Sequence, residues 1–159
     1  MNIFVVSTDP VVAAQMLCDE HVVKMPLESA QMLSTAFEPG MAPYRRTHYN
    51  HPCAVWTRTS EANYRWLLAH AQALSEEYTF RYGKKHKSGE VVAWCANHIQ
   101  LLAFPVKERT PFAIAMDDRY KVNEDPVASY RNFYVLDKSR FAHWEHGRRP
   151  PSWYLERLG

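Results

Sequence analysis

The chain has 159 residues, a length that suits one compact domain. Apolar residues make up 47% of it and charged residues 23%, which favours a packed core and excludes wholesale disorder. The formal net charge of +2 neither requires nor forbids a nucleic-acid partner. No apolar run is long enough for a transmembrane helix. Residues 1–6 have no basic segment and only a short apolar run, so they are not expected to be a signal peptide. Three scattered cysteines favour reduced thiols in the cytoplasm: Cys18, Cys53 and Cys95.

The first part of the chain predicts an extended segment followed by two helices. Residues 2–6 predict a short strand or an extended arm. Asp9 then supplies a capping side chain and Pro10 suits the first position of a helix. A second helix is expected from near Asp19 towards Phe37. Because proline removes one backbone hydrogen bond, we expect a kink or a break at Pro26.

The rest of the chain also reads as helices joined by irregular segments. Residues 38–52 predict a loop, and the best helix begins at Thr59 or Ser60, runs to about Tyr82 and is stopped by Gly83. Beyond it the sequence predicts a helix over 88–103, an irregular stretch over 104–123, a helix opened by Asp125-Pro126 that runs to Leu136, and a last turn over 153–155. Strand signals are scarce, so the predicted fold is all-α, with a single domain over residues 1–159.

One polar stripe of the second helix carries candidate catalytic groups. His21, Lys24, Glu28 and Gln31 recur at steps of three and four residues, which places them on one helical face. A carboxylate beside an amine and an imidazole can perform acid–base chemistry. The alternative is a solvated face on which Lys24 and Glu28 form an ordinary ion pair.

The loop before residue 53 is a candidate for binding phosphates or a sugar, because its side chains are cations and hydrogen-bonding groups: Arg45, Arg46, Thr47, His48, Tyr49, Asn50 and His51. His48 and His51 are an alternative pair of metal ligands, but no carboxylate or cysteine stands at a recognised spacing, so no metal is expected. In a third reading, Asn50 and His51 only bond to the backbone and hold a turn.

Two further segments are basic. The first follows the longest helix and contains Arg81, Lys84, Lys85, His86 and Lys87. In the second, cations alternate with aromatic residues: Arg140, Phe141, Trp144, Arg148, Arg149, Trp153, Tyr154 and Arg157. Cations that neutralise phosphates and aromatic rings that stack on bases are typical of proteins that distort nucleic acids, although a solvated basic surface has the same composition.

Known cofactor and catalytic signatures are absent from the sequence. The five glycines form no phosphate-binding loop, and neither a GxSxG nor an HExxH motif occurs, so no cofactor is expected. Cys53 is the only thiol with a neighbour, His51, that can activate it, and we do not expect it to act as a nucleophile.

Several motifs carry a resemblance to a known family. Leu17-Cys18-Asp19-Glu20-His21 followed by Glu28 resembles the catalytic helix of the bacteriophage pyrimidine-dimer DNA glycosylase (endonuclease V) family. The stretch from Tyr49 to Pro52 is similar to the YRNHP stretch of its cellular members, and Pro151-Ser152-Trp153-Tyr154 resembles its aromatic tail. The motifs HVVKM, RYGK and DPVxxYR also resemble a group of phage-encoded proteins of uncertain function.

The resemblance implies a compact helical DNA N-glycosylase, with or without AP-lyase activity, that repairs a damaged or modified pyrimidine. Glu28 falls on the family's catalytic position and would stabilise positive charge on the sugar, while His21 and Lys24 would hold Glu28 and the phosphate. The loop residues and Arg148 and Arg149 would contact the DNA backbone. Trp153 and Tyr154 would pack against displaced bases.

Two positions depart from the family pattern. The family's nucleophile is the α-amine exposed when the initiator methionine is removed, but Asn2 is too large for efficient removal. The sequence therefore leaves two candidate nucleophiles, the α-amine of Met1 and the side chain of Lys24. Gln31 stands where the family has a DNA-binding arginine.

Three functions stay open at this point. The first is the DNA glycosylase, for which we expect a monomer that acts on double-stranded DNA in the cytoplasm, the host's if the protein is phage-encoded. The second is an enzyme of the same fold that cleaves a nucleoside or nucleotide glycosidic bond outside duplex DNA. The third is a binder of nucleic acid or protein without catalysis.

Overall fold

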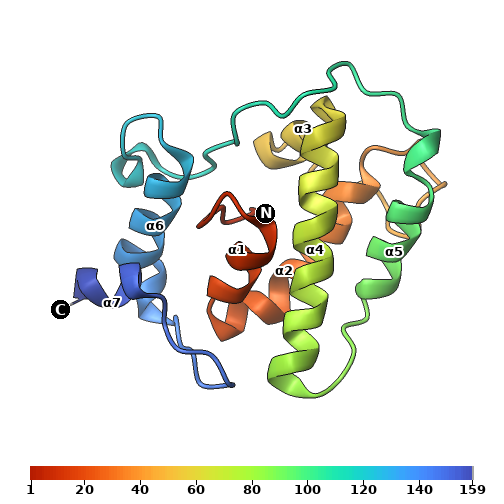
Figure 1. The fold of residues 1–159 in the computed structure, drawn as a ribbon. Coiled ribbons are helices and arrows are strands. Elements are labelled where there is room, and N and C mark those ends of the chain that lie inside the picture. Colours follow the sequence, from red (N-terminus) through yellow and green to blue (C-terminus); the bar gives the residue numbers. More distant parts are fainter. Residues whose placement is uncertain (159) are drawn as a thin grey trace.

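The computed structural model describes residues 1–158, and every regular element within them is helical (Figure 1). This confirms the predicted all-α fold. The only bridge of β type in the described part pairs Ser60 with Val106. No helix of the described residues is both long and apolar enough to cross a membrane.

The first two helices begin where the sequence predicts. Helix α1 (Pro10–Met16) starts after Asp9, whose carboxylate accepts hydrogen bonds from the amides of Val11 and Val12. Helix α2 (Asp19–Ser34) runs without interruption through the buried Pro26, so the break that we considered does not occur. Because α2 packs against α4 and α5, tertiary contacts hold the helix despite the missing hydrogen bond.

The central helix also matches its signals, but a shorter helix before it was not predicted. Helix α4 (Glu61–Tyr82) is capped by the hydroxyl of Ser60 and ends at Gly83, whose φ of 70° lies in the left-handed region that suits glycine. Helix α3 (Pro52–Thr59) fills the segment that links the predicted loop to α4. Figure 1 shows α4 as the longest element, with α5 along one side.

The remaining elements are short. They are α5 (Gly89–Asn97), the 3-10 turns η1 (Ile99–Leu101) and η2 (Asp118–Tyr120), α6 (Pro126–Leu136), the 3-10 turn η3 (Lys138–Arg140) and α7 (Ser152–Leu158). The helix predicted over 88–103 therefore ends earlier and continues only as η1. The irregular stretch predicted over 104–123 is confirmed apart from η2, and it crosses the top of the molecule in Figure 1 from α5 to α6.

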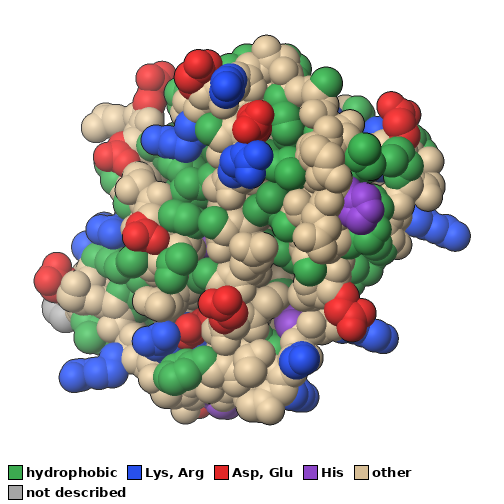
Figure 2. All heavy atoms as spheres, turned by 45° about the vertical axis from the view of Figure 1, so that its right-hand side comes forward, with side chains coloured by type: hydrophobic (Ala, Val, Ile, Leu, Met, Phe, Trp, Pro, Cys, Tyr) green, Lys and Arg blue, Asp and Glu red, His purple; other side chains and the backbone are tan. Residues whose placement is uncertain are grey.

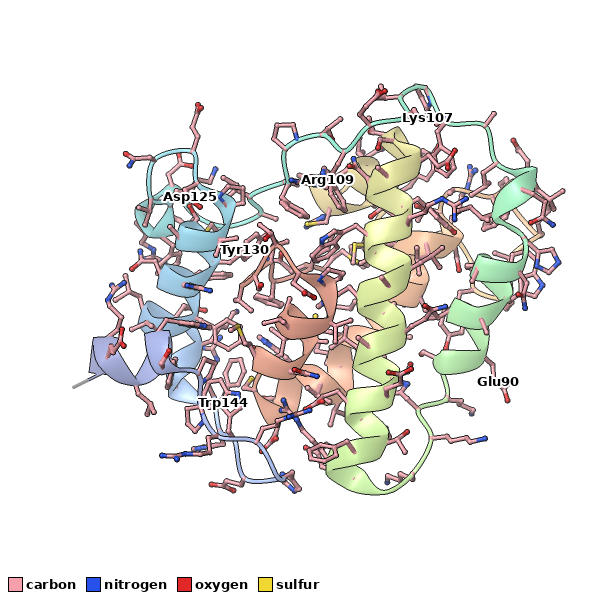
Figure 3. All side chains as sticks on the ribbon, in the orientation of Figure 1. Glu90, Lys107, Arg109, Asp125, Tyr130 and Trp144 are labelled. Atoms are coloured by element: carbon pink, nitrogen blue, oxygen red, sulfur yellow. The ribbon has the colours of Figure 1, made fainter. Side chains whose placement is uncertain are left out.

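The N-terminal segment is an irregular, buried arm rather than a strand. Ile3, Phe4, Val5 and Val6 are all less than 5% exposed, and the arm lies between α6 and α4 (Figure 1). Tyr130 reaches towards it from α6 (Figure 3), where its hydroxyl donates to Oδ1 of Asn2 at 2.8 Å. The arm therefore enters the core and carries the first residues of the chain with it.

A buried ionic cluster fastens the C-terminal part of the chain to the helices. Arg81 is fully buried and contacts the carboxylates of both Asp19 and Glu77. The second oxygen of Asp19 accepts from the amide of Glu145 at 2.7 Å, and Arg148 pairs with Glu77. Because these partners lie in α2, α4 and the segment after η3, the cluster fixes that segment beside the start of α2.

Candidate active site

The α-amine of Met1 lies 3.3 Å from Oε1 of Glu28. The same oxygen accepts the backbone amide of Asn2 at 3.0 Å, and Glu28 is only 7% exposed. The amine comes from the buried arm and the carboxylate from the middle of α2. The structure thus brings together two groups that the sequence analysis named separately, a nucleophile candidate and the family's catalytic glutamate.

These groups open onto a cavity of about 410 Å³. Its wall combines the arm, one face of α2 and the region from α6 to just beyond η3. The lining residues are Met1, Asn2, Phe4, Glu20, His21, Lys24, Met25, Glu28, Phe133, Lys138, Arg140 and Phe141. The sequence analysis missed Phe4, Phe133 and Lys138 as members of this site. The arm brings Phe4 to the site, and the placement of α6 and η3 against α2 brings Phe133 and Lys138.

His21 lines the cavity as a neutral ring. Burial lowers its pKa to about 3, and the charges of Lys138 and Lys24 act in the same direction. Its Nδ1 is hydrogen-bonded to the hydroxyl of Tyr134, and its ring stacks on Phe4 with centroids 4.2 Å apart. His21 therefore does not have the role that the resemblance implied, which was to hold Glu28. It is held itself by aromatic residues of the arm and α6.

Phe4 occupies an uncommon backbone conformation. Its φ of 61° lies in the left-handed region, which a bulky residue adopts only when its surroundings require it. The ring packs against His21 and the aromatic residues of α6, Tyr130, Phe133 and Tyr134. This packing holds the arm in the turn that brings its first residues to Glu28.

Three cations surround the mouth of the cavity. Nζ of Lys24 is 3.8 Å from Oε2 of Glu28, and its side chain is 65% exposed. Lys138 and Arg140 both face Asp137, at 3.1 and 3.7 Å. On the face that Figure 2 shows, basic and acidic side chains are interleaved rather than collected in one patch, in keeping with the small net charge. The cavity wall also contains the carboxylates of Glu20 and Glu28, so its positive charge is partly balanced.

The basic loop lies next to the site but takes no part in its wall. Nδ1 of His51 accepts the amide of Cys53 at 3.0 Å and so caps α3, which confirms the turn-holding role considered for it. Burial, the α-ammonium of Met1 and the neighbouring His48 lower the pKa of His51. Arg45, His48 and Asn50 are exposed. Within the described residues, no three His, Cys, Asp or Glu side chains lie together as a metal site requires.

The C-terminal residues that the resemblance placed against DNA differ in how far contacts inside the protein engage them. The positive charge of Arg148 is paired with the carboxylate of Glu77, to which Arg148 donates two hydrogen bonds. Tyr154 is 5% exposed and packs against Trp144, and it therefore cannot stack on a base without leaving the core. The half-buried Trp153 donates to the sulfur of Met16. Arg149 is exposed and makes no ion pair within the described residues.

All three thiols are buried, and this removes them from the chemistry. Burial raises the pKa of Cys53 to about 11 and also raises the pKa values of Cys18 and Cys95. Since the thiolate is the reactive form, none of them is activated. His51, which stood as a possible activator of Cys53, instead accepts its backbone amide.

Comparisons with known proteins identify the family. The model of the family described as pyrimidine dimer DNA glycosylase matches residues 1–90, more than half of the chain. No curated protein and no solved structure matches. The matched part contains Met1, His21, Lys24 and Glu28, whereas the part of the cavity wall after α4 lies outside it. That one domain spans all of residues 1–159 stays a prediction. The chain belongs to the pyrimidine dimer DNA glycosylase family, which implies a DNA glycosylase function and DNA as the substrate.

Proposed function

We propose that this protein is a DNA N-glycosylase that removes a damaged or modified pyrimidine from double-stranded DNA, with the α-amine of Met1 as its nucleophile. The observation that carries the proposal is the distance of 3.3 Å between that amine and Oε1 of Glu28, inside a cavity lined by aromatic and basic side chains. An amine, a carboxylate and an opening large enough for part of a nucleotide are what this reaction requires.

The first step needs an uncharged amine. Glu28 is the nearest acceptor for the proton that the α-ammonium must lose. The amine then attacks C1′ of the target nucleotide and the glycosidic bond breaks. The base leaves with the electron pair of that bond and with the proton that Glu28 had accepted, so that Glu28 is again a carboxylate. The carboxylate of Glu28, already held by the amide of Asn2, stabilises positive charge on the sugar.

A lyase step would follow from the same intermediate. When the C1′–O4′ bond of the sugar ring breaks, O4′ takes up the proton that the attacking nitrogen loses, and the nitrogen and C1′ form a protonated imine. This imine acidifies the proton on C2′, and loss of that proton with cleavage of the C3′–O bond gives strand scission by β-elimination. The balance requires only a base for the C2′ proton, and Glu28 stands beside the imine position. AP-lyase activity is therefore part of the proposal.

The neighbouring side chains would position the substrate. The neutral ring of His21, hydrogen-bonded through Nδ1 to Tyr134, forms part of the cavity wall. Lys24, Lys138 and Arg140 supply positive charge for the phosphates that flank the sugar. Phe4, Phe133 and Phe141 give apolar surface against which a base or sugar can pack.

Two other amines must be separated from Met1 by experiment. Lys24 approaches the second oxygen of Glu28 at 3.8 Å, but its side chain is 65% exposed and so lacks the burial that would activate it. If Met1 were removed, the amine of Asn2 would be the new terminus, and its nitrogen lies 3.0 Å from the same carboxylate oxygen. The arm thus places either terminal nitrogen beside Glu28.

The test is borohydride trapping on duplex DNA that carries an abasic site, and then on duplex DNA with ultraviolet lesions. We expect a covalent adduct with the wild type, and an adduct at least 100-fold weaker with Glu28→Gln. Mass spectrometry of the adduct peptide should locate the DNA on the terminal nitrogen. Lys24→Gln should keep the adduct, because that side chain is not the attacking amine.

Controls separate chemistry from folding and binding. Glu28→Gln should bind the same duplex with unchanged or higher affinity, because it removes a negative charge from the site. An adduct on Lys24 would overturn the assignment of Met1. No adduct, together with no release of base, would overturn the glycosylase itself and leave a DNA-binding protein.

A further inference from the structure

Two arginines from different elements converge on one exposed tyrosine, outside the cavity just described. The guanidinium carbon of Arg58, in α3, lies 3.7 Å from the ring centroid of Tyr49, and that of Arg46, in the basic loop, lies 4.5 Å from it. Tyr49 is 38% exposed. The three side chains are called here the arginine–tyrosine cluster. Arg46 and Tyr49 are neighbours in the basic loop, and α3 adds Arg58 to them.

The positive charge of this cluster is not balanced. Arg46 donates Nε and Nη2 to the carbonyl of Phe37, and Arg58 donates Nη1 to the hydroxyl of Thr35. Both acceptors are uncharged, and within the described residues neither arginine pairs with a carboxylate. Since a guanidinium has five N–H donors, most of those in the cluster are left for another acceptor.

The two like charges also oppose each other. Burial lowers the pKa of Arg58, and the nearby charge of Arg46 lowers it further. Three other guanidinium groups that lie on aromatic rings, those of Arg119, Arg140 and Arg148, are each paired with a carboxylate. Arg119 lies over Tyr120 at 4.9 Å and pairs with Asp117. The arginine–tyrosine cluster is thus a preorganised pair of cations that a phosphate group would neutralise with charge-assisted hydrogen bonds.

The cluster stands in line with the active site. Thr35, which Arg58 contacts, follows Glu28 by seven residues along α2, and a spacing of seven returns to the same helical face. Two turns of helix correspond to about 10 Å along the axis, at about 1.5 Å per residue. In the opposite direction along α2, Lys24 lies one turn before Glu28. Thr35 itself is buried at the C-cap of α2, so Lys24 and the arginine–tyrosine cluster lie towards opposite ends of α2 from Glu28.

We propose that the arginine–tyrosine cluster binds a backbone phosphate of the DNA strand that enters the cavity, so that this strand runs along α2. The choice of DNA as ligand rests on the proposed function, but the cluster and its charge do not. At about 3.4 Å per nucleotide, the contacted phosphate lies about three nucleotides from the target nucleotide. Arg58, which the sequence did not indicate, thereby joins Arg46 and Tyr49 of the basic loop at the DNA interface.

The first test measures the dependence of DNA affinity on salt. Arg46→Gln and Arg58→Gln are each made in the Glu28→Gln background, so that no chemistry is needed. Loss of one phosphate contact should weaken binding to an abasic duplex about ten-fold and lower the slope of log K against log salt by about 0.9. Arg119→Gln is the matched control, because it removes an arginine that stacks on a tyrosine but already has an acidic partner.

The second test locates the phosphate. Single methylphosphonate linkages, which carry no charge, are placed one at a time at phosphates one to five nucleotides from the abasic site, on either side. At one position, expected about three nucleotides away, the Glu28→Gln protein should lose affinity about ten-fold while the Arg58→Gln double variant loses nothing more. Equal losses for both proteins at every position would overturn the proposal.

Folding is checked separately, because Arg58→Gln also removes the bond to Thr35. Thermal unfolding of each variant shows whether it is folded at the assay temperature. Arg58→Lys keeps the charge and should keep the salt slope while it weakens binding, since an ammonium lacks the planar fork. A slope that stays unchanged in both Arg46→Gln and Arg58→Gln contradicts the phosphate site. Absence of a covalent adduct in the trapping experiment contradicts the glycosylase and leaves these binding results standing.

Discussion

Arg148 donates two parallel hydrogen bonds to the carboxylate of Glu77, from Nε to Oε2 at 2.8 Å and from Nη2 to Oε1 at 3.0 Å. The same carboxylate also accepts from the fully buried Arg81 at 2.7 Å. Two cations therefore offset the burial of Glu77. Burial alone would raise the pKa of this carboxyl, but its bonds to Arg148 and Arg81 lower it. In turn, the hydrogen bond to Glu77 raises the pKa of Arg148. Arg148, which the resemblance placed at the DNA interface, thus has a structural contact inside the protein.

The first prediction compares Arg148 with its exposed neighbour Arg149. Arg148→Gln should lower the free energy of unfolding by about 1–3 kcal/mol, because it leaves part of a buried carboxylate unpaired. Arg149→Gln should change it by less than about 0.5 kcal/mol, as is usual for an exposed side chain. Urea unfolding of the two variants measures the difference. Equal stability of the two would contradict the structural role of Arg148.

The second prediction concerns the terminal amine. A Gly-Ser extension before Met1 moves the α-amine along the chain by up to about 7 Å, since a residue spans at most about 3.5 Å. Borohydride trapping should then fall at least 100-fold, because attack depends on the position of the amine to within about 1 Å. The same two residues added after Gly159 serve as the control. An adduct that survives the N-terminal extension would point to Lys24.

The third prediction is a loss of stability in mild acid. Burial lowers the pKa of His70 to about 4 and that of His21 to about 3. Because the folded-state pKa is below the ordinary value of about 6.5, these groups contribute stability that is fully present above pH 6.5 and is lost as pH falls towards the folded-state values.

Between about pH 6.5 and pH 4, each such histidine should lower the free energy of unfolding by about 1.4 kcal/mol per pH unit. Chemical unfolding at several pH values in that window measures the slope. His70→Gln, which keeps a donor for the carbonyl of Pro10, should flatten it, whereas His143→Gln, at an exposed position, should not. A slope unaffected by His70→Gln would contradict the assignment.

The fourth prediction is that the folded protein resists thiol reagents. All three cysteines are buried, and the raised pKa of Cys53 keeps its thiol protonated at neutral pH. Reaction with a disulfide reagent should be slow until urea exposes all three thiols. Cys53→Ser should also leave borohydride trapping unchanged, and a lost adduct with an intact fold would give Cys53 a role in the chemistry.

Local signals predicted most helix ends correctly, because capping depends on a few adjacent residues. Asp9, Ser60 and Asp125 each accept a backbone amide at a helix start, and Gly83 adopts the left-handed conformation at a helix end. Helix α3 was missed because its cap is the ring nitrogen of His51 rather than a usual capping side chain. Pro52 at its first position was the signal that could have indicated it.

Only part of the active site could be predicted from the sequence. Spacing on one helix put His21, Lys24 and Glu28 on a common face, and the family resemblance singled out Glu28. Their different burial could not be read from that spacing, because the arm and α6 cover His21 and Glu28 while Lys24 remains exposed.

By itself, then, the sequence determined the helical class, the helix boundaries set by caps, and the carboxylate of the candidate site. Tertiary structure alone decided three contacts. The α-amine of Met1 lies beside Glu28, Arg148 pairs with Glu77, and Arg58 lies over the ring of Tyr49 together with Arg46. The physical reason is the range of the interactions. A cap or a helical face is fixed within a few residues, whereas these pairs form only when packing of the core brings distant segments together.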